Sequence, residues 1–153
     1  KIPLSAYQDF NAFKLYLLDV GLLAAKAGVD DKTILEGNAI FEEFKGSLTE
    51  QYVLCQIKEC TDLDVFYWSS DTGIAELDFI TQIGRNNVPI EVKANTNRAK
   101  SMRQLIKSDT YTDIKHGIKL MAGNVGISEN IVTFPYFCTF LLKRYMGKQN
   151  LFQ

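Results

Sequence analysis

Cysteine and histidine are scarce in this chain, and their positions exclude several kinds of site. The three cysteines, Cys55, Cys60 and Cys138, are odd in number and form no CxxC pair. This argues against a disulfide framework and a zinc site, and for a reducing, cytoplasmic setting. The single histidine, His116, falls in a predicted loop with no second ligand nearby in the sequence, so we assign it no role.

Long apolar runs, phosphate-binding loops and an excess of positive charge are also missing. No apolar run approaches the length of a membrane span and no signal-peptide pattern is present, so we expect no membrane partner. There is no Gly-rich phosphate loop, no Ser/His/Asp set and no internal repeat. Because the formal net charge is -1, binding of nucleic acid would need a local basic patch.

What the chain does contain is ample material for a core. Its 153 residues are 46% hydrophobic and 12% aromatic, which predicts one folded domain over residues 1–153. Residues 1–30 are predicted to be a short N-terminal extension, with a strand at Phe13–Leu18 and a helix that follows the capping residue Asp19 and ends at Gly28. The start at Lys1 suggests a fragment of a longer protein, and the oligomeric state stays open.

Beyond the extension, hydrophobic periodicity predicts alternating helices and strands, an α/β pattern. The expected helices are Ile34–Glu59, Arg98–Asp109 and Tyr136–Met146, the last opened by Pro135. The expected strands are Asp64–Trp68, Ala75–Gln82, Val88–Ala94, Ile118–Ala122 and Ile131–Phe134, with a turn at Gly123–Gly126. The second and third strands form a β-hairpin through the Gly84-containing link 83–87.

The hairpin carries the most informative charged residues. Side chains two apart on a strand share a face, so Glu91 pairs with Lys93, and Glu76 with Asp78. If the two acidic faces coincide, Asp78, Glu91 and Lys93 meet. Two carboxylates suit Mg²⁺, and a lysine could orient or deprotonate a metal-bound water. The alternative is a solvated sheet face with a weak Glu91–Lys93 ion pair.

Two further sets of charged residues have open interpretations. Glu50 lies on the apolar stripe of the first long helix, where a carboxylate needs a metal, a lysine or hydrogen-bond donors, unless it reaches solvent. A dense basic cluster on the helix after the hairpin either contacts phosphate or is a solvated helix face: Arg98, Lys100, Arg103 and Lys107. The aromatic residues Tyr67 and Trp68 are predicted to pack on the sheet rather than to stack on bases.

The order of these motifs resembles the PD-(D/E)xK nuclease superfamily. More closely, the chain resembles the uncharacterised C-terminal domain of a large group of prokaryotic AAA-type ATPases. The stretches that carry the resemblance are Phe13–Leu23, Gly46–Glu50, Tyr67–Ser69, Glu76–Phe79, Pro89–Ala94 and the strand-Pro-Tyr step Ile131–Tyr136. The proline that names the superfamily is replaced by Leu77.

The resemblance implies a restriction-endonuclease-like fold, in which helices flank a mixed central β-sheet. It also implies Asp78, Glu91 and the Val92 carbonyl as ligands of a weakly bound Mg²⁺ or Mn²⁺, Lys93 as the catalytic lysine and Glu50 as the helix acid. The expected function is a nuclease-like domain that acts on DNA and is joined to an AAA-type ATPase domain in the full-length chain. The alternative is a non-catalytic module that binds nucleic acid or protein for that ATPase.

Overall fold

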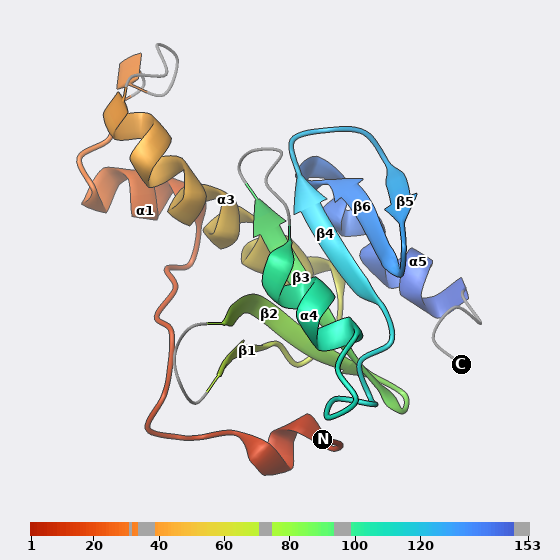
Figure 1. Cartoon of the computed structure of the whole chain (residues 1–153). Coiled ribbons are helices and arrows are strands. Elements are labelled where there is room, and N and C mark those ends of the chain that lie inside the picture. Colours follow the sequence, from red (N-terminus) through yellow and green to blue (C-terminus); the bar gives the residue numbers. More distant parts are fainter. Residues whose placement is uncertain (31, 34–38, 71–74, 94–98, 149–153) are drawn as a thin grey trace.

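Six strands form one mixed sheet, and helices cover both of its faces (Figure 1). The computed structural model describes residues 1–30, 32–33, 39–70, 75–93 and 99–148. The strands are β1 Phe66–Ser69, β2 Glu76–Ile83, β3 Asn86–Lys93, β4 Gly117–Met121, β5 Gly126–Ser128 and β6 Ile131–Pro135. The helices are α1 Val20–Lys26, α3 Ala39–Cys60, α4 Lys100–Ile106 and α5 Leu142–Lys148, with 3₁₀ turns η1 Leu4–Tyr7 and η2 Tyr136–Leu141. This confirms the predicted α/β fold.

The sheet has the strand order β1-β2-β3-β4-β6-β5. β1, β2 and β3 pair antiparallel, β3, β4 and β6 pair parallel, and β5 adds an antiparallel edge. The predicted hairpin is confirmed, but its turn is shorter than the sequence indicated because Ile83 already pairs with Asn86. Gly84 takes a φ of 58°, a left-handed conformation that glycine adopts without steric cost.

Two apolar cores lie on the two faces of the sheet. The α3-side core joins Val53 and Ile57 of α3 to the sheet and to α5, with Phe79, Val88, Ile90, Val92, Ile118, Leu120 and Phe134. The α4-side core joins Met102 and Leu105 of α4 to Leu77, Ile80, Ile114 and Ile131. Residues 86–92 of β3 are all buried. The alternative interpretation, in which Glu91 lies on a solvated face of this strand, is therefore wrong.

Several boundaries differ from the predicted ones. The helix expected at Tyr136–Met146 is divided into η2 and α5. β5 was not predicted, and it begins at Gly126, the last residue of the predicted turn. Three residues at the edge of a sheet give too short a pattern to detect in the sequence. The described part of α3 agrees with the predicted helix, whereas α4 ends at Ile106, three residues before the predicted end at Asp109. Residues 34–38 and 94–98, with Arg98 and Ala94, lie outside the described residues.

The strand predicted at Phe13–Leu18 is wrong. This segment pairs with no described strand and runs beside α3 instead, with Phe13, Leu15 and Leu18 exposed by 77%, 86% and 85%. The next prediction is confirmed, because the Asp19 carboxylate caps α1 by accepting a hydrogen bond from the Leu22 N–H at 2.8 Å. Among the helices that the structure describes, none combines the length and apolar character needed to cross a bilayer.

Candidate functional site

A β-bulge in β2 decides where Asp78 lies. β1 pairs Phe66 with Ile80 and Trp68 with Leu77, so two steps along β1 match three steps along β2. Leu77 and Ile80 both pack in the α4-side core, which strict alternation of a strand does not allow for residues three apart. Asp78 therefore sits in the irregular part of β2, and bulges of this kind re-aim side chains.

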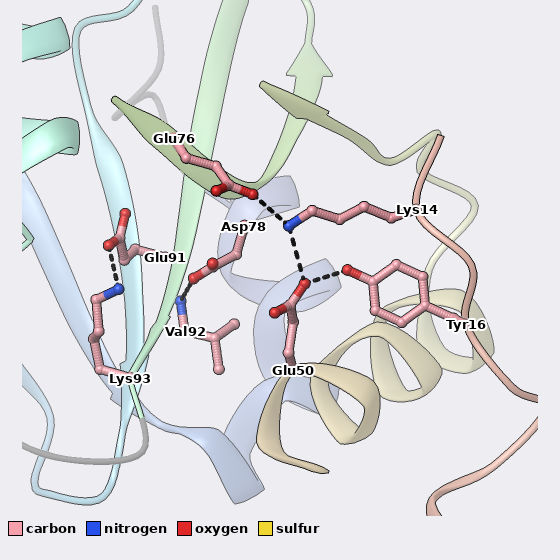
Figure 2. A network of polar contacts seen from close by, with 8 residues as sticks. All are labelled: Lys14, Tyr16, Glu50, Glu76, Asp78, Glu91, Val92 and Lys93. Atoms are coloured by element: carbon pink, nitrogen blue, oxygen red, sulfur yellow. Dashed lines mark hydrogen bonds and ion pairs between the residues drawn. The ribbon is translucent and has the colours of Figure 1, made fainter. Parts of the chain in front are cut away.

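The sheet opens between β2 and β3 at the same place. Their pairing runs from the turn only to Phe79 and Ile90, after which β2 continues along β1 and β3 continues along β4. In this opening, Asp78 Oδ2 accepts a hydrogen bond from the Val92 backbone N–H at 2.7 Å (Figure 2). The carboxylate thus takes the place of a neighbouring strand as the hydrogen-bond partner of β3.

The surroundings of Asp78 favour its neutral form. Burial is the largest influence and raises its pKa, while the hydrogen bond from Val92 and the charge of Lys93 lower it. The charges of Glu91 and Glu50 raise it further, and the resulting pKa is about 6. Glu50, Asp78 and Glu91 are therefore close enough for the negative charges of Glu50 and Glu91 to disfavour ionisation of Asp78.

Glu91 and Lys93 form an ion pair of 2.5 Å between Oε1 and Nζ. The Glu91 side chain is only 6% exposed, and its other oxygen, Oε2, is buried and makes no hydrogen bond within the described residues. Burial lowers the pKa of Lys93, but its bond to Glu91 and the negative charges around it outweigh this and raise the pKa. Lys93 is therefore an ammonium at neutral pH.

The Glu91–Lys93 pair faces α4. Ile90 and Val92 belong to the α3-side core, so alternation turns Glu91 to the opposite side of β3. The parallel register with β4 places Lys119 beside it. Burial is the main reason that the pKa of Lys119 is lowered, and the charges of Arg103 and Lys93 lower it further, against the effect of Glu91. The buried acid thus lies in a basic setting.

Glu50 lies on α3, and two residues of the N-terminal segment bind it. Its Oε1 accepts a hydrogen bond from the Tyr16 hydroxyl and lies 3.4 Å from Lys14 Nζ. Lys14 also reaches Glu76 Oε1 at 2.8 Å, so its ammonium joins α3 to the start of β2 (Figure 2). The predicted need of the Glu50 carboxylate for a lysine and hydrogen-bond donors is met by these two residues.

Both partners of Glu50 keep their protons at neutral pH. Burial lowers the pKa of Lys14, but the bond to Glu76 and the charges of Glu50, Glu76 and Asp78 together raise it. Burial raises the pKa of the Tyr16 phenol, and the hydrogen bond to Glu50 adds to this. Lys14 and Tyr16 therefore remain hydrogen-bond donors over the whole physiological range.

The structure gathers the predicted acids at one end of the sheet but on two sides of β3. Glu50 lies on the α3 side, Asp78 fills the opening between β2 and β3, and Glu91 and Lys93 lie toward α4, so the two acidic faces of the hairpin do not coincide. The reason is the bulge in β2, which the sequence pattern did not indicate.

Sequence reasoning missed Lys14 and Tyr16, and it placed Glu76 beside Asp78 without foreseeing its ion pair with Lys14. The signal for the first two was the alternation of Phe13–Leu18, in which Lys14 and Tyr16 share one face. That face carries the polar contacts and points to the site, whereas the apolar residues Phe13 and Leu15 were expected to be inside and are exposed.

The basic residues of α4 are partly neutralised by an acid. Arg103 Nε lies 3.7 Å from Glu129 Oε2, and Lys107 Nζ lies 3.4 Å from Glu129 Oε1. Lys100 is exposed.

The aromatic Trp68 packs edge-to-face on Tyr111 with ring centroids 5.8 Å apart, as expected for a packing role.

The donor set can be compared with what Mg²⁺ requires. In the described part of the chain, no three His, Cys, Asp or Glu side chains are close enough to hold one ion together. Mg²⁺, however, is commonly held by one or two carboxylates and several waters. The buried, unpaired Glu91 Oε2 and the neighbouring Asp78 carboxyl fit such a site, with Glu50 further out.

Fold and site together define an α/β domain with an acid-and-lysine cluster where a mixed sheet opens. The chain belongs to the family described as domain of unknown function DUF4143, whose model matches residues 45–138, more than half of the chain. This domain is usually found with AAA ATPases, which agrees with the expected family. The match covers Glu50, Asp78, Glu91 and Lys93 but not Lys14 and Tyr16. No curated protein matches the chain.

Proposed function

We propose that this domain is a nuclease-like module that binds Mg²⁺ or Mn²⁺ and hydrolyses DNA phosphodiesters. The observation that carries the proposal is the Glu91 carboxylate, which is almost fully buried and has an oxygen without a hydrogen-bond partner in the described part of the chain. Such an atom is unfavourable unless it binds something, and the neighbouring Asp78 supplies a second carboxylate.

In this proposal, Asp78, Glu91 and the Val92 carbonyl would hold the ion. Mg²⁺ would supply Lewis acidity at a phosphate oxygen and lower the pKa of a bound water. Lys93, held as an ammonium beside Glu91, would position that water and offset the negative charge that develops on the phosphate. Glu50, which lies on the α3 side, would bind a second ion or a water of the first ion.

DNA would approach over the α4 side of the sheet. Lys93, Lys119 and Arg103 lie on this side, and the exposed Lys100 extends the positive charge along α4. Phosphate contacts by such residues give affinity without sequence specificity.

The other partner in this proposal is an AAA-type ATPase domain in the same full-length chain. The proposed location is cytoplasmic, in line with three cysteines that form no disulfide.

Calorimetric titration with Mn²⁺ tests the proposal. We expect weak binding to the wild-type chain and its loss in both Asp78→Asn and Glu91→Gln, because one carboxylate alone seldom holds the ion. Asp62→Asn is the matched control, since Asp62 is an exposed aspartate 2.8 Å from Lys143. Equal binding by the wild type and the two site variants would move the ion elsewhere.

Activity is tested on the same proteins with supercoiled and linear DNA in Mg²⁺. Cleavage by the wild type that is lost in Asp78→Asn, Glu91→Gln and Lys93→Met, and kept in Asp62→Asn, is the expected result. Cleavage that all variants retain equally would point to a contaminating nuclease and would remove the support for catalysis by this site.

A second candidate is a non-catalytic module that binds a protein partner for the ATPase. The favouring observation is the N-terminal segment, which exposes Tyr7, Phe10, Phe13, Leu15 and Leu18 by 60% or more. Exposed apolar residues that follow one another along a segment are typical of a protein contact. This candidate predicts no Mn²⁺ binding and no cleavage by the wild-type chain in the two experiments above.

A further inference from the structure

We propose that Lys14 and Tyr16 are positioning residues that hold Glu50 in place for the ion site. The proposal rests on the function proposed above and extends it to residues outside the part of the chain that the family model matches. It assigns a role to the N-terminal segment 13–18, which the sequence pattern assigned to a core strand.

The segment is attached to α3 through the backbone of Leu17. The Gln51 side chain, 2% exposed, accepts a hydrogen bond from Leu17 N–H at 3.0 Å and donates one to the Leu17 carbonyl at 2.7 Å. One amide side chain thus satisfies both polar groups of a backbone residue, as a neighbouring strand would do. Cys55, one turn further along α3, donates to the Leu18 carbonyl at 3.5 Å.

Gln51, which holds the segment, directly follows Glu50 on α3. The segment is bound to α3 one residue away from the helix acid, so Lys14 and Tyr16 are held where they can reach it. The alternation of the extended segment points these two side chains toward α3 and β2 and leaves Phe13 and Leu15 in solvent.

The two contacts to Glu50 fall on the same carboxylate oxygen. The Tyr16 hydroxyl and the Lys14 ammonium both meet Oε1. Figure 2 shows the other oxygen of Glu50 on the side of the carboxylate nearer to Asp78 in this view. Two donors on one oxygen limit rotation of the carboxylate, so its second oxygen keeps one direction.

Lys14 is itself held on more than one side. Its ammonium lies 2.8 Å from Glu76 Oε1 and 5.4 Å from the centre of the Tyr67 ring. A lysine on a flexible stem with a single contact would not orient a carboxylate, but one fixed by β1, β2 and α3 does. Lys14 therefore connects three elements of the site.

The test uses the 153-residue chain and four variants: Tyr16→Phe, Lys14→Met, Lys14→Arg and the control Tyr7→Phe. Tyr7→Phe makes the same chemical change at an exposed tyrosine of the same N-terminal region. The first readout is the carboxyl ¹³C resonance of Glu50 at pH 7 without metal. The second is the affinity for Mn²⁺ by calorimetry.

We expect the Glu50 resonance to shift in Tyr16→Phe and Lys14→Met but not in Tyr7→Phe. Loss of a residue that orients a metal ligand commonly weakens metal binding by about 10-fold or more, and we expect that loss in the first two variants. Lys14→Arg keeps a cation that can reach both acids, so it should bind Mn²⁺ within about 2-fold of the wild type.

The outcomes separate this inference from the function on which it rests. If the wild type binds Mn²⁺ and Tyr16→Phe and Lys14→Met bind it equally well, the positioning role is wrong and the ion site stands. An unchanged Glu50 resonance in these two variants also overturns the role. If the wild type binds no Mn²⁺, the proposed function is wrong, and the positioning role falls with it.

Discussion

At the scale of single residues, the buried Glu91 carboxylate is the most demanding group of the site. Its side chain is 6% exposed, and Lys93, 28% exposed, is the cation bonded to it. A buried charge that loses its partner is left uncompensated, which is far more unfavourable than loss of an exposed ion pair. The two members of the pair are therefore not equivalent, since Lys93 can reach solvent and Glu91 cannot.

Replacing the two members separately should show this asymmetry. We expect Lys93→Met to lower the free energy of unfolding by about 3 kcal/mol, because it leaves the Glu91 charge buried and unpaired. Glu91→Gln removes one of three neighbouring negative charges, so stability should stay unchanged or rise. Urea unfolding at pH 7 measures both, and the double variant should recover most of the loss. Losses of no more than about 1 kcal/mol in both single variants would instead indicate a solvent-screened surface pair.

The raised pKa of Asp78 makes a prediction about pH. Its folded-state pKa of about 6 lies above the ordinary value of 3.8, so its protonated form favours the folded state. This contribution is complete below pH 3.8 and is lost as the pH rises through 6. Asp78→Asn keeps an oxygen acceptor for Val92 N–H and does not ionise. From pH 4 to pH 7, the wild type should therefore lose about 2 kcal/mol of stability relative to this variant.

The measurement is urea unfolding of both proteins in EDTA at several pH values between 4 and 7. Asp62→Asn is the control, because the hydrogen bond and charge of Lys143 lower the pKa of the exposed Asp62. Its stability difference from the wild type should therefore change with pH in the opposite direction, and only slightly. A difference for Asp78→Asn that does not depend on pH would contradict the raised pKa.

At the scale of elements, a bulge and a strand opening create the site. The pairing of β2 with β1 and of β3 with β4 continues past the point where β2 and β3 part. The polar backbone of β3 must then find other partners, and the Asp78 carboxylate supplies one at Val92. A regular hairpin would have filled this space with backbone hydrogen bonds and left no opening for a ligand.

The attachment of the segment 13–18 to α3 is also an element-scale feature. We expect Gln51→Ala to release the segment, because both polar groups of Leu17 lose their partner. The free energy of unfolding should fall by about 1–2 kcal/mol, the usual value of one or two hydrogen bonds.

Limited proteolysis measures the release directly. Trypsin cleavage after Lys14 and chymotrypsin cleavage after Tyr16 should become several-fold faster in Gln51→Ala, while the sheet stays protected. Gln56→Ala, on the same helix, is the matched control and should leave the cleavage rates unchanged. Equal rates in Gln51→Ala and wild type would show that other contacts hold the segment.

At the scale of the whole molecule, two apolar cores on either side of one sheet provide the stability. Neither core includes the charged cluster, which lies where β2 and β3 part. The chain should therefore fold without metal, in contrast to small domains that need an ion to form.

This prediction is checked by circular dichroism in EDTA and in 10 mM Mg²⁺. We expect the same spectrum in both, and an increase in unfolding free energy of about 1 kcal/mol with Mg²⁺ if the dissociation constant is in the millimolar range. Glu91→Gln should lose this increase. A chain that gains its secondary structure only when Mg²⁺ is added would contradict the prediction.

Much of the fold could be predicted from local patterns. The hairpin, the presence of α3 and α4, the Asp19 cap and most of the order of helices and strands follow from periodicity and turn residues. These features depend on residues close together in the sequence. The short strand β5 and the division of the last helix were missed because three to six residues carry too little periodicity.

The sequence by itself determined which element carries each of Glu50, Asp78, Glu91 and Lys93, because strand and helix periods are local. Only the tertiary structure decided how they face one another. The bulge at Asp78 depends on pairing with β1, and Lys14 meets Glu50, 36 residues away, only after the segment has docked on Gln51. A strand pattern shows which residues share a face. It contains no information about a bulge, which depends on the pairing of β2 with β1. It also does not show that the Gln51 side chain, rather than a neighbouring strand, binds the backbone of Leu17.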